Sequence, residues 1–397
     1  MEELRESKVG EEKVSTERKM PKGKRIRDVI HDYVLLDPLA LALVDTPTVQ
    51  RLRRVRQVGT AYLVYPGANH TRFEHSLGTY HLAKECVRTL GLNPELAIAA
   101  LLHDVGHGPF SHVSEEVLGP HEKRSLDRVL HSELSDVLLR YDVEPSTIAR
   151  YIRGEGDYGS LISGTIDVDR MDYLARDAHH TGVSRGMDLS RLIVTLRASD
   201  GKIGVTEGGL PALESFLISR FLMYPTVYLH HTCRVGEMML VRALQVAIRE
   251  RELSLDELAG MDDVDLIARL RTLGGYPGEI IQRLDRRDLL KVAYRARYSE
   301  DLKQIDPKAM EKEMAEDCRI PDSWVIVDVP PAPRMEEVDA PILSDLGTKK
   351  AGEVSTLIRA LAEAQKDYRR VCVYVPAEYR EMAGAAARIY MQPTTLK

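Results

Sequence analysis

The sequence predicts a mostly α-helical protein with a small β hairpin and a smaller α+β domain at its C-terminal end. From Asp37 onward, apolar residues recur at three- and four-residue steps, as the buried face of an α-helix requires. The segment 200–206 alternates apolar and polar residues, and strand-like runs appear beyond residue 253. Because 397 residues exceed the length at which a single core usually keeps growing, we expect one large helical body and a smaller second domain.

The helical body begins with a periodic run in which Leu41, Val44, Leu52, Val55 and Val58 share one apolar face. The same periodicity predicts further helices at 74–90, 94–106, 124–140, 145–153, 167–180, 189–197 and 210–249. The segment DGKIGVT at 200–206 starts with a glycine-containing turn and is typical of one strand of a short hairpin. The large body is therefore mostly helical.

The C-terminal domain shows both helical and strand-like apolar periodicity. Helical patterns at 255–271 and 277–292 precede the strand-like runs VAYRARY, WVIVDVPP and VCVYVPA, and another helical pattern covers 350–367. Twelve of the thirteen histidines lie between residues 70 and 231, so ionisable chemistry is expected in the helical body. We predict a mobile charged arm at 1–24, a helical domain at 25–252 and an α+β domain with a regulatory or assembly role at 253–397.

Composition excludes several classes of protein. Hydrophobic residues make up 44% and charged residues 29% of the chain, which is incompatible with a largely disordered protein. No run of about 18 uncharged apolar residues occurs and the N-terminus is polar, so we expect a cytoplasmic protein without a membrane partner. The four cysteines are widely spaced, which predicts neither a thiolate zinc site nor a disulfide framework.

The charge balance gives two interpretations of one basic cluster. The net charge of −6 disfavours a general nucleic-acid coat, and single-stranded nucleic acid is not an indicated partner. The cluster RLRRVR at 51–56 is a candidate for receiving a polyphosphate. The alternative, favoured by charge alone, is the solvated face of a helix.

The stretch LLHDVGHGPFSH at 101–112 carries the strongest chemical signal. His103 and Asp104 are adjacent near the end of an apolar helix, which the glycines and proline at 106–109 then stop. Both side chains reach one metal ion only if the ion lies at the flank of that helix. Such a site needs another imidazole and another carboxylate, and His75 and Asp169 fit that need.

The predicted donor set of imidazoles and carboxylates suits one divalent ion: Mn²⁺, Fe²⁺, Zn²⁺ or, less comfortably, Mg²⁺. Asp169, Tyr173 and Asp177 recur every four residues on one predicted helix. The alternative for this helix is a charged face turned to solvent. The apolar residues Met171 and Leu174 weaken that alternative, because they would draw the helix into the core.

With these residues the chain resembles a known family, the HD-domain dNTP triphosphohydrolases. This family includes the animal sterile-alpha-motif HD-domain enzyme and its bacterial and archaeal relatives. The resemblance runs from about residue 30 to residue 249 in six ordered blocks, at 45–59, 65–78, 101–112, 121–125, 167–182 and 218–234. It implies an HD-domain helical bundle in which 25–252 is the catalytic domain. We expect no sterile-alpha-motif domain, because the N-terminal arm is too short to be one.

The resemblance implies roles for the residues around the metal. The four ligands that it implies are those already selected, His75, His103, Asp104 and Asp169. It implies that four residues surround the α-phosphate: His107, His112, Glu115 and His121. Among them, His107 is the leading candidate for proton transfer, and Glu115 orients His121 or His107. Arg72, three residues before His75 on one helix face, resembles the family's phosphate arginine and would bind phosphate oxygens in a bidentate way.

The resemblance also implies a nucleotide pocket. Gln57 and Val58 match positions that touch the deoxyribose and base, and Tyr173 and Asp177 match those that close against the sugar edge. Three residues match the helix that covers the polyphosphate and base: Arg220, Tyr224 and Tyr228. A tyrosine packed under the ribose 2′ carbon would prefer deoxynucleotides, because an added hydroxyl would clash with its ring.

Three positions depart from the animal enzyme. Arg170 replaces a lysine, so a phosphate-binding charge is kept, and Glu115 replaces an aspartate. Tyr224 replaces a histidine, and Pro225 is expected to disfavour helical geometry at Tyr224.

Asp45 and Arg53 match positions where the animal enzyme recognises an activating guanine nucleotide between subunits. The alternative is that Asp45 caps a helix that starts at Thr46 and Pro47, and both interpretations stay open. Relatives assemble as dimers or tetramers, so the resemblance implies a homodimer or homotetramer. For three further histidines, His131, His230 and His231, we expect hydrogen-bonded buried rings.

The implied reaction is metal-assisted hydrolysis of a dNTP at the α-phosphorus, which releases a deoxynucleoside and inorganic triphosphate. A second hypothesis is an HD-type phosphohydrolase that cleaves nucleoside monophosphates or nucleic-acid ends. A third is a nucleotide-sensing protein with weak catalysis. The intact set of ligands and proton-transfer residues argues against the third.

Overall fold

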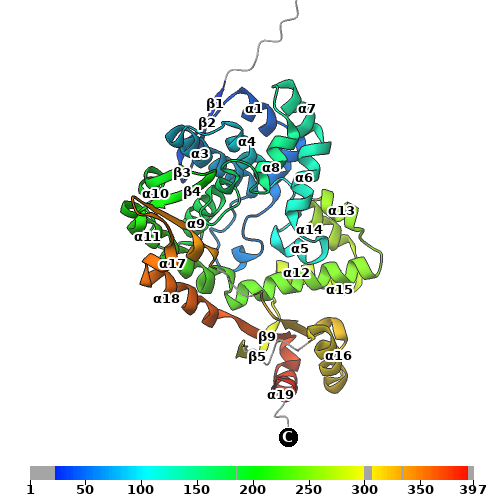
Figure 1. Cartoon of the computed structure of the whole chain (residues 1–397). Helices are drawn as coiled ribbons and strands as arrows, with labels where there is room; N and C mark the ends of the chain where they lie inside the picture. The colour runs from blue at the N-terminus through cyan, green and yellow to red at the C-terminus, as the bar shows by residue number, and fades with distance from the viewer. Residues whose placement is uncertain (1–22, 185, 299–305, 332–334, 392–397) are drawn as a thin grey trace, which may run out of the picture.

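The structure, a computed structural model, describes residues 23–184, 186–298, 306–331 and 335–391 (Figure 1). The arm predicted at 1–24 lies outside the described residues except for Gly23 and Lys24, and Lys24 already begins the first strand. The predicted fold class is confirmed, because helices make up most of the chain and the strands form small sheets. Among the described residues, none of the helices is both long and apolar enough to cross a membrane.

The N-terminal part is a helical body preceded by a hairpin of β1 and β2. Its helices enclose one large apolar core. The elements in chain order are β1 (Lys24–Asp28), β2 (Asp32–Leu36), α1 (Pro38–Val44), α2 (Pro47–Arg51), α3 (Arg72–Leu90), α4 (Glu95–Leu102), α5 (His112–Leu118), α6 (His121–His131), α7 (Glu133–Arg140), α8 (Pro145–Ile152), α9 (Val168–Thr181), α10 (Leu189–Thr195), α11 (Leu210–Met223) and α12 (His231–Arg249).

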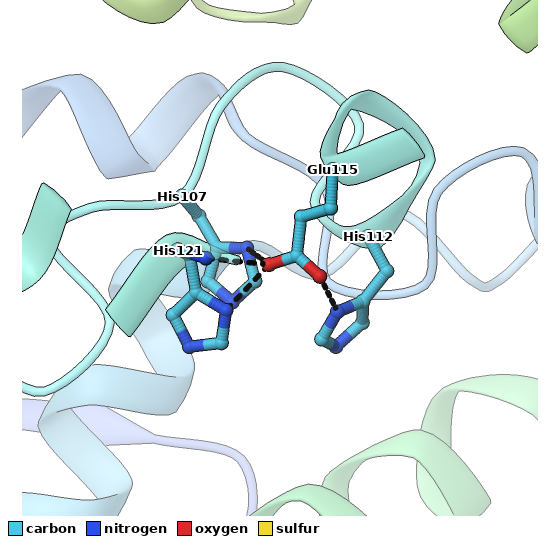
Figure 2. Close-up of side chains that lie close together, drawn as sticks. All are labelled: His107, His112, Glu115 and His121. Atoms are coloured by element: carbon cyan, nitrogen blue, oxygen red, sulfur yellow. Dashed lines mark hydrogen bonds and ion pairs between the residues drawn. The ribbon is translucent and has the colours of Figure 1, made fainter. Parts of the chain in front are cut away.

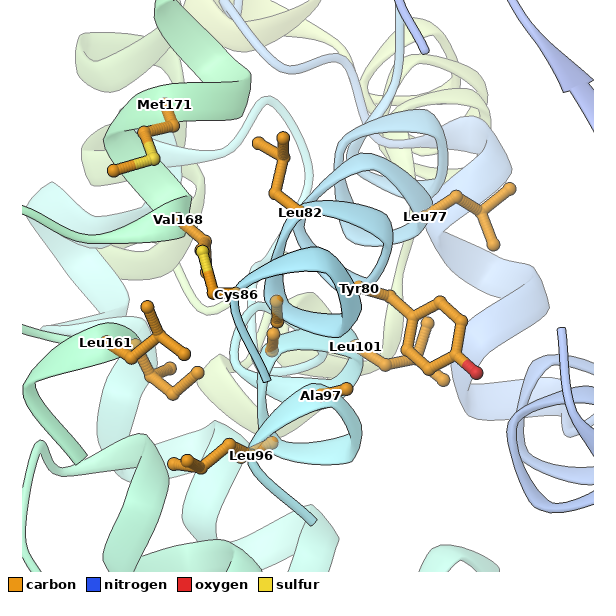
Figure 3. Packing of buried hydrophobic residues seen from close by; sticks show 14 of the residues in the cluster. Leu77, Tyr80, Leu82, Cys86, Leu96, Ala97, Leu101, Leu161, Val168 and Met171 are labelled. Atoms are coloured by element: carbon orange, nitrogen blue, oxygen red, sulfur yellow. The ribbon is translucent and has the colours of Figure 1, made fainter. Parts of the chain in front are cut away.

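Helix α3 is the central element of this body, and its ends are encoded locally. A capping box joins Thr71 and Glu74 at its start, and Gly91, with φ of 67°, ends it in the left-handed conformation. Its apolar side chains meet those of α4 and α9 in the core that Figure 3 shows, where Leu101 and Met171 are fully buried. This packing brings the three helices together, and each of them carries or precedes residues predicted to hold the metal.

Two small sheets lie in the second half of the chain. The predicted hairpin is confirmed as β3 (Leu196–Ser199) and β4 (Lys202–Thr206), and it belongs to a four-stranded sheet. In that sheet β7 (Pro341–Ser344) pairs in parallel with β4, and β8 (Gly347–Lys350) follows β7. The three predicted C-terminal strands are also confirmed: β5 (Lys291–Arg297), β9 (Arg370–Val375) and β6 (Ile326–Asp328) form one antiparallel sheet.

The C-terminal part also contains further helices. They are α13 (Leu255–Gly260), α14 (Asp263–Thr272), α15 (Gly275–Asp285), α16 (Pro307–Cys318), α17 (Ala351–Val354), α18 (Thr356–Gln365) and α19 (Arg380–Tyr390). Helices α16 and α19 were not predicted, and the helix predicted at 277–292 ends at Asp285 because β5 begins at Lys291. All four cysteines are free and buried, as expected of thiols outside any ligand cluster.

Several predicted helices are divided. The helix predicted at 124–140 breaks at Ser132, whose side chain accepts from the N–H of Leu134 and caps α7. The helix predicted at 94–106 ends at Leu102. The segment 210–249 contains α11 and α12 with a π-helical turn at Tyr224–Tyr228 between them. Apolar periodicity does not reveal such breaks, because the apolar face continues across them.

Two local predictions were wrong. Tyr224 is helical, with φ of −60° and ψ of −62°, although Pro225 follows it. The π turn accommodates the proline, because Leu229 donates its N–H to the Tyr224 carbonyl at 2.7 Å across the widened turn. Asp45 does not cap α2: the N-cap is Thr46, whose hydroxyl accepts from the N–H of Val49, and exposed Asp45 ends α1.

A strained turn before α5 depends on the C-terminal part of the chain. Phe110 and Ser111 have φ of 56° and 55°, a conformation that non-glycine residues seldom adopt. Asp263, at the start of α14, accepts the N–H of Phe110 at 2.6 Å and the N–H of Arg56 at 3.0 Å. The Ser111 hydroxyl donates to the Arg56 carbonyl at 2.6 Å. The buried carboxylate of Asp263 therefore clamps the turn from outside.

Substitution of this clamp tests its contribution to stability. In Asp263→Ala, the buried N–H of Phe110 and the partly buried N–H of Arg56 lose their acceptor, and the loss should cost about 1–3 kcal/mol of the free energy of unfolding for each group that stays unpaired. Urea denaturation measures the change, with Val264→Ala on the exposed side of the same helix as the control. Equal stability of the two variants would show that the clamp contributes nothing.

Candidate active site

The four predicted metal ligands converge between three helices. His75 lies on α3, His103 and Asp104 directly follow α4, and Asp169 lies in the first turn of α9. Oδ1 of Asp169 is 3.1 Å from Nε2 of His75 and 3.6 Å from Nε2 of His103. Asp104 approaches the same two nitrogens at 3.4 Å and 3.3 Å. The chain thus brings together two imidazoles and two carboxylates that are 94 residues apart at their extremes, from His75 to Asp169.

Hydrogen bonds on the far side of each ring set the direction of the ligand nitrogens. Nδ1 of His75 is 2.8 Å from Asp172, and Nδ1 of His103 is 2.7 Å from the carbonyl of Ala100. Both acceptors require a protonated Nδ1, which leaves Nε2 to offer its lone pair to a metal. Both Nε2 atoms are buried without a hydrogen-bond partner. A divalent cation would satisfy these two atoms, so the residues fit a metal ion.

The electrostatics of the cluster agree with this fit. Burial lowers the pKa of His75, but the nearby carboxylates of Asp169 and Asp172 outweigh burial and raise that pKa to about 9. Burial raises the pKa of Asp169, but the two histidines outweigh it, and the net pKa lies well below its usual range. Carboxylates thus favour a positive charge beside His75, and without a metal a proton supplies that charge.

Asp172 orients His75 and is itself held by Arg176 and His31. Arg176 donates from Nε and Nη2 to its two oxygens, each at 2.9 Å, and Nε2 of His31 lies 2.6 Å from Oδ1. A side chain at Gly78 would place its Cβ 1.8 Å from the same Oδ1, so only glycine leaves room for this carboxylate. The sequence analysis missed Asp172. Its spacing of three residues from Asp169 and four from Arg176 was the available signal.

A second cluster contains the four residues expected around the α-phosphate, and Figure 2 shows them facing one another. One oxygen of Glu115 lies 2.5 Å from Nδ1 of His121 and 3.6 Å from Nδ1 of His107. Its other oxygen lies 2.8 Å from Nδ1 of His112. The rings of His107 and His121 stack with their centres 3.6 Å apart. Glu115 is therefore the common partner of all three imidazoles.

Asp104 connects the two clusters. Its Oδ1 lies 3.4 Å from Nε2 of His107 and 3.3 Å from Nε2 of His121, in addition to its contacts with the metal histidines. Arg72 donates from Nη1 to the other oxygen of Asp104 at 2.5 Å and from Nε to the Ser111 hydroxyl at 2.8 Å. Arg72 thus links a predicted metal ligand to the strained turn described above.

The two stacked histidines differ in protonation. Burial lowers the pKa of His121, but its bonds to Asp104 and Glu115 outweigh burial and raise that pKa to about 9. Burial, together with the positive charges of Arg72 and His121, holds the pKa of His107 well below its ordinary value. The pKa of Glu115 is lowered, because the bonds from His112 and His121 outweigh the effect of burial. In this pair the ring of His121 therefore carries a second proton and is charged, whereas the ring of His107 is neutral.

A cavity of about 830 Å³ opens in front of both clusters. All of the residues predicted to bind the substrate line it: Gln57, Val58, Arg72, Arg170, Tyr173, Asp177, Arg220, Tyr224 and Tyr228. Asp104, His112, Glu115, His121 and Asp169 also reach its wall. Asp177 is fixed there by the hydroxyl of Tyr228 and by Nε2 of His70, each 2.7 Å away. The structure thus gathers the residues from the separate blocks around one space.

Some wall residues were missed by the sequence analysis. Arg234 and Glu237 come from α12, and Glu336 comes from the segment before β7. Arg234 ends the block at 218–234 but was given no role, and Glu237 and Glu336 lie outside the six blocks, so only the fold brings the three residues to the cavity. Arg234 pairs with Asp328 at 2.7 Å and with Glu237 at 2.8 Å.

Other sequence predictions lie away from the cavity. Asp45 and Arg53 are exposed near the ends of α1 and α2, and the Arg53 guanidinium stacks 3.7 Å above the ring of Phe73. His131 and His231 are exposed, so the expected buried rings were wrong for both. His230 is half-buried, and its Nδ1 accepts from the N–H of Thr232 at the start of α12.

Comparison with known sequences places this site within a family. The HD domain matches residues 72–177, and the HD associated region matches residues 187–395. An uncharacterized protein of Methanocaldococcus jannaschii is 38% identical over 374 residues, which cover 89% of this chain and 80% of that protein. The deoxynucleoside triphosphate triphosphohydrolase SAMHD1 of Bos taurus is 34% identical over 228 residues, 45% of this chain and 39% of that enzyme.

Solved structures share the fold. A hypothetical protein from Aquifex aeolicus superposes with a TM-score of 0.78 at 33% identity, covering 92% of this chain and 99% of that one. A phosphohydrolase from Bacteroides thetaiotaomicron superposes with a TM-score of 0.73 at 27% identity, covering 89% of this chain and 99% of that one. The architecture therefore extends over both matched regions.

The support that Asp172 gives to His75 can be tested at Gly78. In Gly78→Ala, the added Cβ would displace the Asp172 carboxylate, and the affinity for Mn²⁺ should fall by about 10–100-fold. Calorimetric titration of the purified variant measures this affinity.

Gly260→Ala is the matched control, because its Cβ would meet no atom within 4 Å. Asp172→Asn, which keeps the volume of the side chain, should lose affinity in the same range. Wild-type affinity in a folded Gly78→Ala protein would show that Asp172 does not orient the ligand.

Proposed function

The chain belongs to the HD-domain family that carries an HD-associated region, and we propose that it is a metal-dependent hydrolase of deoxynucleoside triphosphates. The proposed products are a deoxynucleoside and inorganic triphosphate. The observation that carries the proposal is the position of Asp104, whose carboxylate touches the metal histidines, Arg72 and the His107–His121 pair. A cation site and a proton-transfer site thus share one residue at the wall of a large cavity. The SAMHD1 relatives are deoxynucleoside triphosphate triphosphohydrolases, which supports the triphosphate substrate.

The proposed cofactor is one divalent transition metal held by His75, His103, Asp104 and Asp169. Two neutral imidazoles with two carboxylates suit Mn²⁺, Fe²⁺ or Zn²⁺ better than Mg²⁺, which prefers oxygen ligands and retains its water. When bound, such an ion polarises a phosphate oxygen and lowers the pKa of a water molecule. Both effects favour hydrolysis of a phosphate ester at neutral pH.

The residues beside the metal site would handle the proton and the developing charge. Glu115 approaches His121 more closely than His107, so it fixes the ring of His121 with Nε2 directed toward Asp104. The stacked pair of His107 and His121 is thereby placed to protonate the leaving oxygen. Arg72, buried at the cavity wall, would stabilise charge on the phosphate while it keeps Asp104 in place.

Other residues that line the cavity supply the contacts for the rest of a nucleotide. Arg170 and Arg220 offer positive charge to a polyphosphate, and the packed rings of Tyr173 and Tyr228 offer a surface for the sugar. We propose that the ring of Tyr173 excludes a ribose 2′-hydroxyl. Because the chain resembles the HD-domain dNTP triphosphohydrolases, we also propose that Asp45 and Arg53 bind a nucleotide effector between subunits of a homodimer or homotetramer.

Product analysis tests the reaction. Protein loaded with Mn²⁺ should convert each dNTP that it accepts to deoxynucleoside and triphosphate, separated by chromatography. The double variant His103→Ala/Asp104→Ala should lose bound metal and at least about a thousandfold of this turnover, whereas exposed His131→Ala should retain both.

Repeating the assay with GTP or a second dNTP tests the effector site, because turnover that appears only in the mixtures would require one. Release of inorganic phosphate from nucleoside monophosphates, without turnover of any dNTP, would replace the proposal with the monoesterase hypothesis.

The preference for deoxynucleotides can be tested at Tyr173. If its ring excludes the 2′-hydroxyl, Tyr173→Ala should lower the ratio of dNTP to NTP turnover by about tenfold. The measurement compares kcat/KM for dATP and ATP in the wild type and the variant. Tyr33→Ala, which removes an exposed ring on β2, serves as the control, and an unchanged ratio in Tyr173→Ala would exclude the ring as the discriminating group.

A further inference from the structure

Two arginines of the cavity share one buried carboxylate that comes from the C-terminal segment. Oε1 of Glu337 lies 3.1 Å from Nε of Arg170 on α9 and 3.0 Å from Nε of Arg220 on α11. The side chain of Glu337 is 0% exposed. Glu337 is about 120 to 170 residues from these partners in the sequence, so no local motif connects them. One carboxylate therefore joins two helices of the cavity wall to a distant segment.

The fold fixes the place of this carboxylate. Glu337 lies in a short 3₁₀ helix (Glu336–Asp339), directly before β7. Strand β7 pairs in parallel with β4, with Ile342 opposite Val205, and Val338 packs against the main core. Because the segment is anchored by sheet pairing and burial, the contact of Glu337 with the arginines belongs to the folded architecture.

The geometry of the contacts separates their roles. Glu337 forms ion pairs with Nε of both guanidinium groups, without hydrogen-bond geometry, and the terminal nitrogens make hydrogen bonds to other residues. Nη1 of Arg220 lies 3.3 Å from Gln365, and its Nη2 lies 3.3 Å from the hydroxyl of Tyr224. Nη2 of Arg170 lies 3.3 Å from Glu336, while its Nη1 pairs with Asp167. The contacts of 3.3 Å are long for charged groups. Phosphate oxygens would replace them without disturbing the ion pairs between Glu337 and the two Nε atoms.

The positive charges of Arg170 and Arg220 favour a carboxylate at the position of Glu337. Two guanidinium groups close to one shared carboxylate would otherwise repel each other at a largely buried wall. Glu337 compensates both charges without entering the cavity, whereas exposed Glu336 is the carboxylate that reaches the cavity lining. Glu337 is thus behind the arginines and does not take the place of a phosphate.

We propose that Glu337 is a positioning residue, which orients Arg170 and Arg220 so that their terminal nitrogens receive the polyphosphate of the substrate. This inference rests on the proposed function, because it assigns a phosphate to these two arginines. It also makes the segment before β7 part of the substrate pocket. Binding of the polyphosphate then depends on a carboxylate that never contacts it.

The first test measures binding of inorganic tripolyphosphate to the metal-free full-length protein by calorimetry. Glu337→Gln keeps the size of the side chain but removes its charge, and affinity should fall by about tenfold or more. In the Mn²⁺-loaded enzyme, the same variant should raise KM for a dNTP about tenfold while kcat changes less. The control is Asp339→Asn on the same 3₁₀ helix, where exposed Asp339 pairs with Lys350 at 2.8 Å.

The Glu337→Asp variant supplies a second readout if the glutamine variant does not fold. It retains the charge but is one methylene shorter, so it should recover only part of the wild-type affinity. Unchanged tripolyphosphate affinity in either folded variant would overturn the inference. Tighter binding in Glu337→Gln would also overturn it, because the carboxylate would then be competing with phosphate.

The results separate this inference from the proposed function. If the wild type hydrolyses no dNTP but tripolyphosphate binding weakens in Glu337→Gln, the substrate is wrong and the positioning role of Glu337 stands. If the wild type hydrolyses dNTPs and the variants bind tripolyphosphate and dNTP as the wild type does, the activity stands and the role of Glu337 fails.

Discussion

The hydrogen bond between Nδ1 of His75 and the carboxylate of Asp172 joins the two helices on which the site is built. It occupies Nδ1 and so directs Nε2 toward His103, Asp104 and Asp169. The bond needs a buried carboxylate, which needs the guanidinium of Arg176, and the close approach of α3 to α9 needs Gly78. Core packing brings the helices together, but this polar network decides which nitrogen faces the cation.

Much of the fold and site could be predicted from sequence because the signals are local. Apolar periodicity located α3 and α9, and adjacent His103 and Asp104 at a helix end indicated a metal. Asp172 was not found, since one short helix also carries Asp169 and Asp177 and their spacing does not say which carboxylate faces the ion. The direction of each side chain depends on how α9 packs, and that information is not in the periodicity.

The remaining misses are breaks in helices and long-range contacts. The π turn between α11 and α12 keeps the apolar face continuous, so periodicity gave one helix where the chain has three elements. Asp263 clamps the turn at Phe110, and Glu337 holds two arginines of the cavity, although neither residue belongs to a motif. The region predicted to be regulatory or to assist assembly therefore also supports the walls of the site.

The position of a bound metal ion tests the central claim most directly, because two histidine clusters lie side by side. Crystals grown with Mn²⁺ would give an anomalous difference peak at the ion. We expect the peak about 2.0–2.3 Å from Nε2 of His75 and His103 and from oxygens of Asp104 and Asp169. A peak among His107, His112, Glu115 and His121, with none between His75 and His103, would contradict the assignment of the metal centre.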